Sequence, residues 1–287
     1  MSRSPIASLD GRRCLITGAA SGIGRATALA ASARGGRVLL TDVNAEGLER
    51  VAAELRAAGG IVDHVEAADV TDHEAIARLA DTIHGSQGSV DVVMNIAGIS
   101  TWGAIERLEH HHWQRVIDVN LMGPIHVLES FVPAMIAAGR GGHVVNVSSA
   151  AGLFGLPWHA PYSASKFGLR GVSEVLRFDL RRHGIGVSLV CPGAVKTPLV
   201  GTVTIVGVDR GDPAVAKLIE RFERHAVSPE HVATKIVEGI ERNRYLVFTS
   251  RDIRVGYWFQ RKFALPYELT MRLLNDRLTA VAERSRR

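Results

Sequence analysis

The segment 144–166 gathers side chains that could move a proton at a carbon–oxygen bond. It opens with an apolar, β-branched run typical of a buried strand and ends in a helical pattern that begins near Tyr162. Tyr162 and Lys166 are four positions apart, so a helix places both side chains on one face. A free phenol titrates at about pH 10, and we expect the neighbouring ammonium group to lower the pKa of Tyr162 toward neutrality. Ser149, at the end of the strand, could hold a substrate oxygen beside the phenol.

A tyrosine and a lysine at this spacing also occur by chance on solvated helices, so the weight of the pair depends on a glycine-rich turn near the N-terminus. An apolar strand over 12–17 runs into Gly18, Gly22 and Gly24, and a helical pattern follows. A strand, a glycine turn and a helix present backbone N–H groups and a helix N-terminus to a pyrophosphate. Tight turns also need glycine for conformation alone. The strand before and the helix after favour dinucleotide binding.

Asp42 ends a second predicted strand, over 37–41. A carboxylate at this place can accept both ribose hydroxyls of an adenosine and would repel a 2′-phosphate. Neither Val43 nor Asn44 is basic, so the sequence predicts NAD as the cofactor rather than NADP. The alternative is that Asp42 caps the helix predicted just beyond it.

Strands and helices alternate along the rest of the chain. Further strands are predicted over 61–67, 90–94, 185–191 and 245–249, besides the one that leads to Ser149. The alternation predicts an α/β fold of the Rossmann type, a doubly wound parallel sheet of about seven strands with helices on both faces. Without a linker or an internal repeat, residues 1–250 are predicted to form a single catalytic domain, followed by an extension over 251–287.

Composition and charge exclude several classes of protein. The chain of 287 residues is 46% hydrophobic and 22% charged, as in ordinary globular proteins. The start of the chain lacks the apolar core of a signal peptide, and Cys14 and Cys191 fall in predicted strands, so we expect a cytoplasmic protein with reduced thiols. The net charge of +5 lies entirely in residues 251–287, which carry 9 Lys and Arg against 4 Asp and Glu. The neutral body argues against nucleic-acid binding.

A helix predicted around 113–119 carries Asn120 near its middle, where an amide among apolar residues suggests a specific hydrogen-bonding role. Just before it, the three consecutive histidines 110–112 would point in different directions on a helix and cannot converge on one ion. We therefore expect no metal site there and interpret these histidines as a solvated helix start.

These motifs, in this order, resemble the short-chain dehydrogenase/reductase family of the T-G-x-x-x-G-x-G and Y-x-x-x-K type, over roughly residues 9–250. Ile96 departs from the pattern, because the family usually has a second asparagine there. The resemblance implies catalytic roles for Asn120, Ser149, Tyr162 and Lys166. It implies cofactor contacts from Gly18, Ser21, Gly22, Ile23, Gly24, Asp42, Asp69, Val70, Asn95, Ala97, Gly98, Tyr162, Lys166, Pro192, Gly193, Val195 and Thr197.

The resemblance also implies what each catalytic residue would do. Tyr162 would be the general acid/base, and Lys166 would hold the nicotinamide ribose and depress the phenol pKa. Ser149 would fix the substrate oxygen, and Asn120 would hold a water that relays protons. Val195 and Thr197 would contact the nicotinamide end of the cofactor.

The substrate is predicted from apolar segments that wall the pocket in the family, 153–158 and 198–208, the second usually a mobile lid. Together with Ser149, Leu156 and Tyr162 as contacts, they favour a lipophilic secondary alcohol or ketone, although they could equally pack on the core. Two other functions stay open: an NADP(H)-dependent 3-oxoacyl thioester reductase, against which Asp42 argues, and a non-catalytic NAD-binding protein, which would be expected to lose the tyrosine or the lysine.

The extension 251–287 combines aromatic and basic residues with a helical leucine pattern after a predicted break at Pro266. Such a segment could lie at a membrane surface. We favour the alternative that it packs on the body or across a subunit interface. By resemblance, the protein is expected to be a homodimer or homotetramer joined partly through the helices that carry Tyr162.

Overall fold

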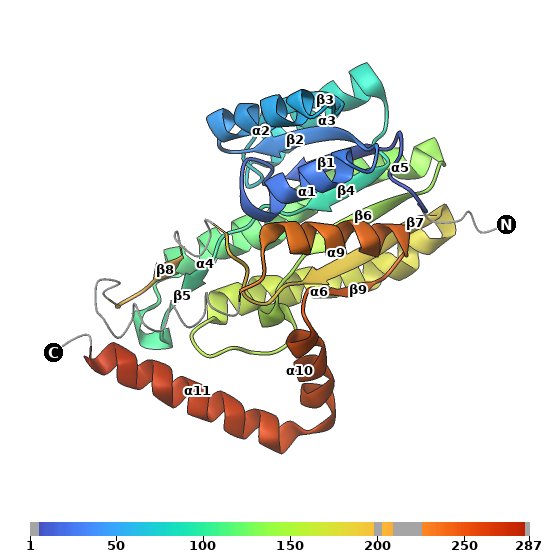
Figure 1. Cartoon of the computed structure of the whole chain (residues 1–287). Coiled ribbons are helices and arrows are strands. Elements are labelled where there is room, and N and C mark those ends of the chain that lie inside the picture. Colours follow the sequence, from blue (N-terminus) through green and yellow to red (C-terminus); the bar gives the residue numbers. More distant parts are fainter. Residues whose placement is uncertain (1–5, 198–202, 209–225, 285–287) are drawn as a thin grey trace.

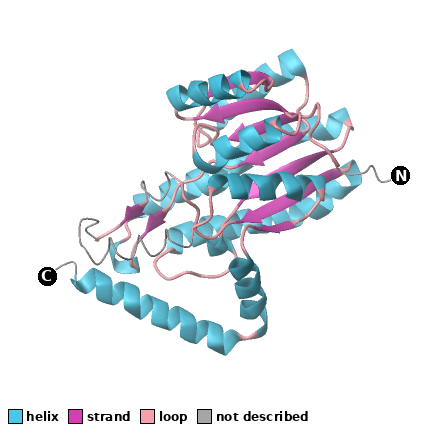
Figure 2. Cartoon of the chain, viewed as in Figure 1, coloured by secondary structure: helices cyan, strands magenta, loops and turns pink. Residues whose placement is uncertain are grey.

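A seven-stranded parallel sheet forms the centre of the computed structural model, which describes residues 6–197, 203–208 and 226–284, with side chains up to residue 280 (Figures 1 and 2). All neighbouring strands pair in parallel. In sheet order the strands are β3 (Val62–Ala67), β2 (Arg37–Asp42), β1 (Arg13–Thr17), β4 (Val92–Asn95), β6 (Gly142–Val147), β7 (Ile185–Cys191) and β9 (Leu246–Phe248). The predicted fold class is confirmed.

Helices cover both faces of this sheet. One face carries α1 (Gly22–Ser32), α2 (Ala45–Ala57) and α9 (Pro229–Glu241), and the other carries α3 (His73–Gln87), α5 (Gly123–Ala138) and α6 (Ala160–Asp179). Each set of three helices packs its apolar side chains into a separate core cluster against the strands. The central strands β4 and β7 are fully buried and mainly apolar, as expected for a parallel sheet, whereas the edge strand β3 is half-buried and carries Asp63, His64 and Glu66.

The order of the strands reverses between β1 and β4. From β1 the chain moves outward through β2 to β3, then returns to β4 on the other side of β1 and continues to β9. In such sheets a crevice opens at the carboxyl ends of the strands where the order reverses. The glycine turn that follows β1 and the segment that follows β4 therefore meet at one place.

The predicted helix before Asn120 is observed as α4 (His110–Ile117). It continues through a π-helical turn, Asp118–Met122, directly into α5. Within the described residues, this stretch of His110–Ala138 is the one helix long and apolar enough to cross a membrane by length and composition. Its apolar residues Val127, Phe131 and Met135 are buried against the sheet, so we interpret it as a core helix.

The predicted strands all occur, with ends that differ from the prediction by at most two residues. A second, small sheet was not predicted: β5 (Thr101–Trp102) pairs with β8 (Thr204–Ile205). β8 belongs to the predicted lid 198–208, of which residues 198–202 lie outside the described part of the chain. The β5–β8 pair joins the remainder of that lid to the segment after β4.

The C-terminal extension forms two helices, α10 (Arg251–Lys262) and α11 (Ala264–Arg284), which meet in an elbow below the body in Figure 1. The helices separate at Phe263, not at Pro266, which lies in the first turn of α11, where proline is tolerated. Tyr257 of α10 is buried in a small apolar cluster with Leu153, Leu189 and Cys191. The expected packing on the body therefore holds for α10.

Candidate active site

The glycine turn after β1 is too tightly packed for side chains at two positions. Gly18 has a positive φ of 68°, and a Cβ atom there would lie 2.8 Å from Cα of Ala97. A Cβ atom on Gly24 would overlap the carbonyl oxygen of Gly18. The hydroxyl of Thr17 accepts hydrogen bonds from the N–H groups of Ile96 (3.0 Å) and Ala97 (3.1 Å). The turn after β1 is thus locked to the segment after β4.

The first turn of α1 keeps its N–H groups available. Ser21 occupies the N-cap position but makes no side-chain capping bond, and the first turn of α1 contains no acidic residue. By contrast, Asn44, Asp72 and Ser228 cap α2, α3 and α9 through their side chains. Uncapped N–H groups and the positive end of the helix dipole suit a pyrophosphate at the start of α1.

Asp42 lies at the end of β2 and faces this turn. Its carboxylate accepts hydrogen bonds from the N–H groups of Ala20 (3.0 Å) and Asn44 (2.9 Å). The helix that follows is capped by Asn44, whose side chain accepts from the N–H of Gly47, so the capping alternative for Asp42 does not hold. A carboxylate has about four acceptor positions, which leaves lone pairs for ribose hydroxyls.

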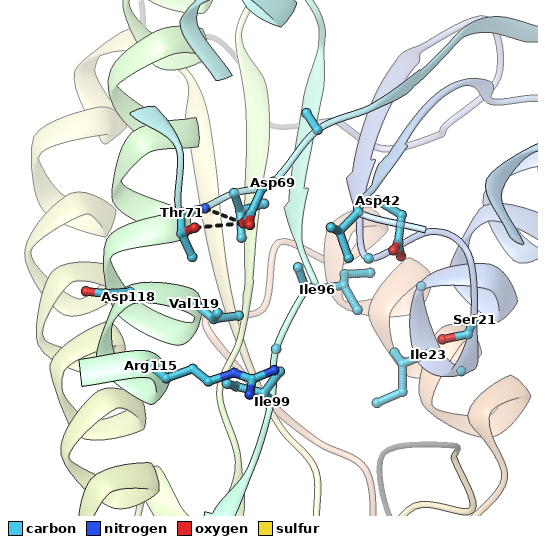
Figure 3. A pocket seen from close by; sticks show the side chains of 18 of the residues that line it. Ser21, Ile23, Asp42, Asp69, Thr71, Ile96, Ile99, Arg115, Asp118 and Val119 are labelled. Carbon is cyan, nitrogen blue, oxygen red and sulfur yellow. Dashed lines mark hydrogen bonds between the residues drawn. The ribbon is translucent and has the colours of Figure 1, made fainter. Parts of the chain in front are cut away.

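A cleft of about 710 Å³ opens between these elements (Figure 3). In Figure 3, Ser21, Ile23 and Asp42 lie across the cleft from Asp118 and Val119. The predicted cofactor residues that line it are Gly18, Ser21, Gly22, Ile23, Gly24, Asp42, Asp69, Val70, Ala97, Gly98 and Thr197. The glycine cradle, the uncapped helix and Asp42 together fit a dinucleotide.

Tyr162, Lys166 and Ser149 come together beside the cleft. The hydroxyl of Ser149 lies near enough to the phenol of Tyr162 to lower its pKa as a hydrogen-bond partner. Lys166 is buried, its Nζ lies 5.7 Å from the centre of the Tyr162 ring, and it donates a hydrogen bond to the carbonyl of Val147 (2.9 Å). A Cβ atom on Gly98, which lines the cleft, would lie 3.5 Å from this Nζ. The three side chains therefore meet at one end of the cleft.

The structure corrects the expected pKa of Tyr162. Burial raises the pKa of the phenol, and the hydrogen bond to Ser149 opposes that rise, whereas Lys166 is not among the causes of the shift. Burial also lowers the pKa of Lys166 to about 8. The ammonium is directed at the carbonyl of Val147, and the loss of solvation decides the direction of the shift at the phenol.

Asn120 lies in the π-helical turn, not within a regular helix, and it has the specific hydrogen bonds that its amide suggested. Its Oδ1 accepts from the N–H of Ile99 (2.9 Å), and its Nδ2 donates to the carbonyl of Ile99 (2.9 Å) and to Oγ of Ser165 (3.2 Å). The segment after β4 is thereby fixed to α6. The structure shows Asn120 as a positioning residue, and its water-relay role stays a prediction.

The loop that carries Leu156 has a strained backbone. Trp158 has a φ of 68°, which is unusual for a bulky residue, and its carbonyl accepts a hydrogen bond from the N–H of Gly103 (2.8 Å). The ring of His159 lies 4.5 Å from that of Trp102. Backbone strain of this kind concentrates at functional sites, where the surroundings enforce it. This loop, which connects Ser149 to Tyr162, is thereby held against β5.

Besides Tyr162 and Lys166, which lie beside the cleft, four predicted cofactor residues do not line it. The side chain of Asn95 points toward the neighbouring strand β6, where its Nδ2 donates to Oδ1 of Asn146 (2.9 Å). Neighbouring side chains of a strand point to opposite faces, so a place at the end of β4 does not by itself bring a side chain into the cleft. Val195 is buried in the core, and the carbonyl of Pro192 accepts from the N–H of Ala150 (2.7 Å). Gly193 packs against Ile253 of α10.

The cleft also has lining residues that were not predicted: Val43, Ala68, Thr71, Ile96, Ile99, His111, Gln114, Arg115, Asp118 and Val119. Half of them come from α4 and the turn after it, and Figure 3 shows Arg115 extending from α4 toward Ile99. The spacing of 111, 114, 115 and 118 places these residues on one helix face, which is the signal that could have found them. His112 instead caps α4 together with Glu109.

A dinucleotide-sized cleft where the strand order reverses, with a buried lysine and a half-buried tyrosine and serine beside it, defines an oxidoreductase site on a Rossmann fold. The family model for short chain dehydrogenases matches residues 12–205, which is more than half of the chain. The chain belongs to this family of oxidoreductases.

Individual proteins show the same similarity. The chain is 34% identical over 249 residues to a C alpha-dehydrogenase of Sphingobium sp., covering 84% of this chain and 81% of that protein. A short chain dehydrogenase/reductase from Burkholderia phymatum in complex with NAD has 31% identity and a TM-score of 0.80, covering 89% and 94%. A metagenomic short-chain oxidoreductase in complex with NADP has 33% identity and a TM-score of 0.66, covering 84% and 96%.

Proposed function

We propose that this protein interconverts a lipophilic secondary alcohol and its ketone by hydride transfer with NAD(H), with Tyr162 as the acid/base. The observation that carries the proposal is that Ser149 and Lys166 both lie next to Tyr162, with Nζ of Lys166 5.7 Å from the centre of its ring, beside a dinucleotide-sized cleft. When bound, the nicotinamide exchanges a hydride with the substrate carbon, and the protein supplies orientation and proton transfer.

The chemistry of the chain itself takes place at the Tyr162 hydroxyl. In ketone reduction the phenol donates its proton to the carbonyl oxygen of the substrate, and in alcohol oxidation the phenolate accepts the hydroxyl proton. The hydroxyl of Ser149, which lies next to Tyr162, can hold the same oxygen and align it with the phenol. Lys166 places a positive charge near the phenolate when it forms, at the 5.7 Å separation from the ring centre.

Asp42 supports NAD as the cofactor. Its carboxylate is fixed at the cleft by two backbone N–H groups and would repel a 2′-phosphate. Solved relatives include proteins bound to NAD and to NADP, so the family alone leaves both open. The same carboxylate argues against the alternative of an NADP(H)-dependent thioester reductase, and the complete Ser149, Tyr162 and Lys166 set argues against a non-catalytic protein.

The preference for a lipophilic substrate rests on the loop between Ser149 and Tyr162. Leu153 is buried, while Phe154, Leu156 and Trp158 are partly exposed around the strained backbone. An apolar lining supports binding of hydrocarbon surface and offers few partners to a polyol.

The direct experiment is a cofactor-specific screen of aliphatic and steroid alcohols against polyols. We expect NAD-linked oxidation of the lipophilic alcohols and a loss of roughly 10²–10⁴-fold in kcat for Tyr162→Phe, because the proton acceptor is removed. Tyr245→Phe is the matched control: its hydroxyl has no hydrogen-bond partner among the described residues, and it should retain wild-type turnover.

Two outcomes would contradict the proposal. Faster turnover of polyols than of lipophilic alcohols would contradict the proposed class of substrate. Full activity of Tyr162→Phe, with dinucleotide binding unchanged by fluorescence titration, would remove the acid/base assignment itself.

A further inference from the structure

The two helices of the elbow, α10 and α11, expose a set of large apolar side chains. We call these residues the arm face: Val255, Trp258, Phe259, Phe263, Leu265, Leu269 and Leu273. Leu265 is 68% exposed, Leu273 62% and Trp258 57%, all high for residues of this type. The rings of Trp258 and Phe259 lie 5.8 Å and 5.0 Å from that of Phe263. The exposed rings therefore form one packed cluster.

We call the two helices α10 and α11 together the arm. Other residues of the arm attach it to the body. The hydroxyl of Tyr257 accepts a hydrogen bond from Arg170 of α6 (2.8 Å), and Ile253 packs against Gly193. The hydroxyl of Tyr267 in α11 donates to the carbonyl of Gly155 (3.3 Å). These contacts occupy one side of the arm, so the arm face is left on the surface of the projecting elbow (Figure 1).

The arm is positively charged, so an anionic surface would attract it. Residues 251–287 carry the whole net charge of +5 of the chain, with 9 Lys and Arg against 4 Asp and Glu. Four of these basic residues lie on α10 among the aromatic rings: Arg251, Arg254, Arg261 and Lys262. All four are exposed, and α10 contains a single acidic residue, Asp252.

We propose that the arm face docks the protein on the surface of an anionic lipid bilayer. Aromatic rings suit the headgroup level, leucines suit the acyl boundary beneath it, and Lys and Arg side chains reach anionic headgroups while their methylene stems stay apolar. A second copy of the chain is the competing occupant, but two copies meeting through this face would bring their clusters of positive charge together, which is unfavourable.

Docking would also bring the catalytic end of the molecule close to lipid. Tyr267 contacts Gly155, and Gly155 belongs to the loop between Ser149 and Tyr162. The loop that walls the pocket would thus lie about one helix diameter from the lipid, behind α11, and a substrate leaving the bilayer would have a short path to it; this consequence alone rests on the proposed function.

Vesicle co-sedimentation of the full-length chain tests the proposal without any measurement of turnover. We expect binding to phosphatidylglycerol/phosphatidylcholine vesicles that weakens with salt, and weaker binding to phosphatidylcholine alone. The Trp258→Ser/Leu269→Ser variant should bind the vesicles at least about tenfold more weakly, since it removes two exposed apolar side chains that the lipid would cover. The Arg254→Gln/Lys262→Gln variant should lose roughly tenfold on anionic vesicles only.

Ile61→Ser is the matched control, because Ile61 is 49% exposed and precedes β3 at the opposite edge of the sheet from α10. It should bind as the wild type does, and circular dichroism should show all variants folded, since every substituted side chain is exposed. The proposal is overturned if the wild type does not bind anionic vesicles, or if Trp258→Ser/Leu269→Ser binds equally well. It is also overturned if the wild type does not bind lipid and that variant has a smaller oligomeric state, which would identify the arm face as a contact between copies.

Discussion

Cofactor preference depends on a single carboxylate. The side chain of Asp42 keeps its orientation through Ala20 and Asn44, so its charge sits at a fixed place on the cleft wall. Because the carboxylate can accept hydrogen bonds from ribose hydroxyls and repels a 2′-phosphate, a neutral residue should remove both effects together.

For Asp42→Ser we expect the ratio of kcat/KM for NAD to that for NADP to fall by roughly 10- to 100-fold, the value of one charge-assisted hydrogen bond. Initial rates with each dinucleotide measure it. Glu46→Gln removes a nearby exposed charge in the first turn of α2 and should leave the ratio unchanged. An unaltered ratio in Asp42→Ser would refute this role.

His143 shows how a buried side chain far from the cleft sets the response to acid. Oγ of Ser188 donates its proton to the carbonyl of Arg244 (2.7 Å), so it must accept from Nε2–H of His143 (2.8 Å). Nδ1 then remains an unpaired acceptor in the core. A second proton on the ring would have no acceptor, and burial lowers the pKa of His143 to about 3.

An unfolded chain binds a proton at this histidine near pH 6.5, whereas the folded chain does not until about pH 3. The free energy of unfolding should therefore fall as the pH drops from about 6.5 toward 3, by up to about 1.4 kcal/mol per pH unit from this residue. His143→Gln keeps a polar group toward Ser188 without titrating, so urea unfolding at several pH values should show a shallower decline. His110→Gln, on an exposed histidine, should decline as the wild type does.

At the scale of elements, the approach of α1 to the glycine turn is the closest fit in the site. A Cβ atom on Gly24 would meet the carbonyl of Gly18, a backbone atom that cannot move aside without disturbing the turn. Gly85, in α3, has open space around its Cα and helical backbone geometry. The two glycines allow the same substitution to be compared in a crowded and in an open helix.

Gly24→Ala should lower the free energy of unfolding by about 1–3 kcal/mol or more and abolish measurable dinucleotide binding, because overpacking displaces the turn. Gly85→Ala should raise stability by up to about 1 kcal/mol, because alanine favours an exposed helix. Denaturant unfolding and fluorescence titration give both values. Unchanged affinity in Gly24→Ala would show that the close approach is not needed for binding.

At the scale of the whole molecule, α6 carries Tyr162 on one face and exposes Phe167, Val175 and Phe178 on another. Val175 is 58% exposed and Phe178 63%, at spacings that place them on one side of the helix. Since the family is commonly oligomeric, we propose that this face of α6 joins two copies, separately from the arm face on α10 and α11.

Val175→Glu should weaken self-association at least about tenfold, because a buried, unpaired carboxylate is costly at an interface. Sedimentation velocity over a concentration series measures the self-association, with Ile61→Glu as a control at another exposed apolar residue, at the far edge of the sheet. If Val175→Glu keeps the wild-type assembly, the copies meet elsewhere.

The sequence by itself determined the elements and the chemistry at their ends. Local patterns of apolar runs, turn residues and helical periodicity give the strands to within two residues, the glycine turn, the four-residue spacing of Tyr162 and Lys166 and the placement of Asp42 at the end of β2. In parallel α/β proteins these local patterns also imply where the site lies, because the ends of consecutive strands share one edge of the sheet.

Only the tertiary structure decided which side chains reach the cleft and in what electrostatic state. Asn95 turns into the sheet toward Asn146, while Arg115 enters the cleft from α4. The pKa of Tyr162 rises although a lysine is nearby, since burial and the direction of the ammonium depend on segments distant in the sequence. Orientation and desolvation are properties of packing, and packing involves every element at once.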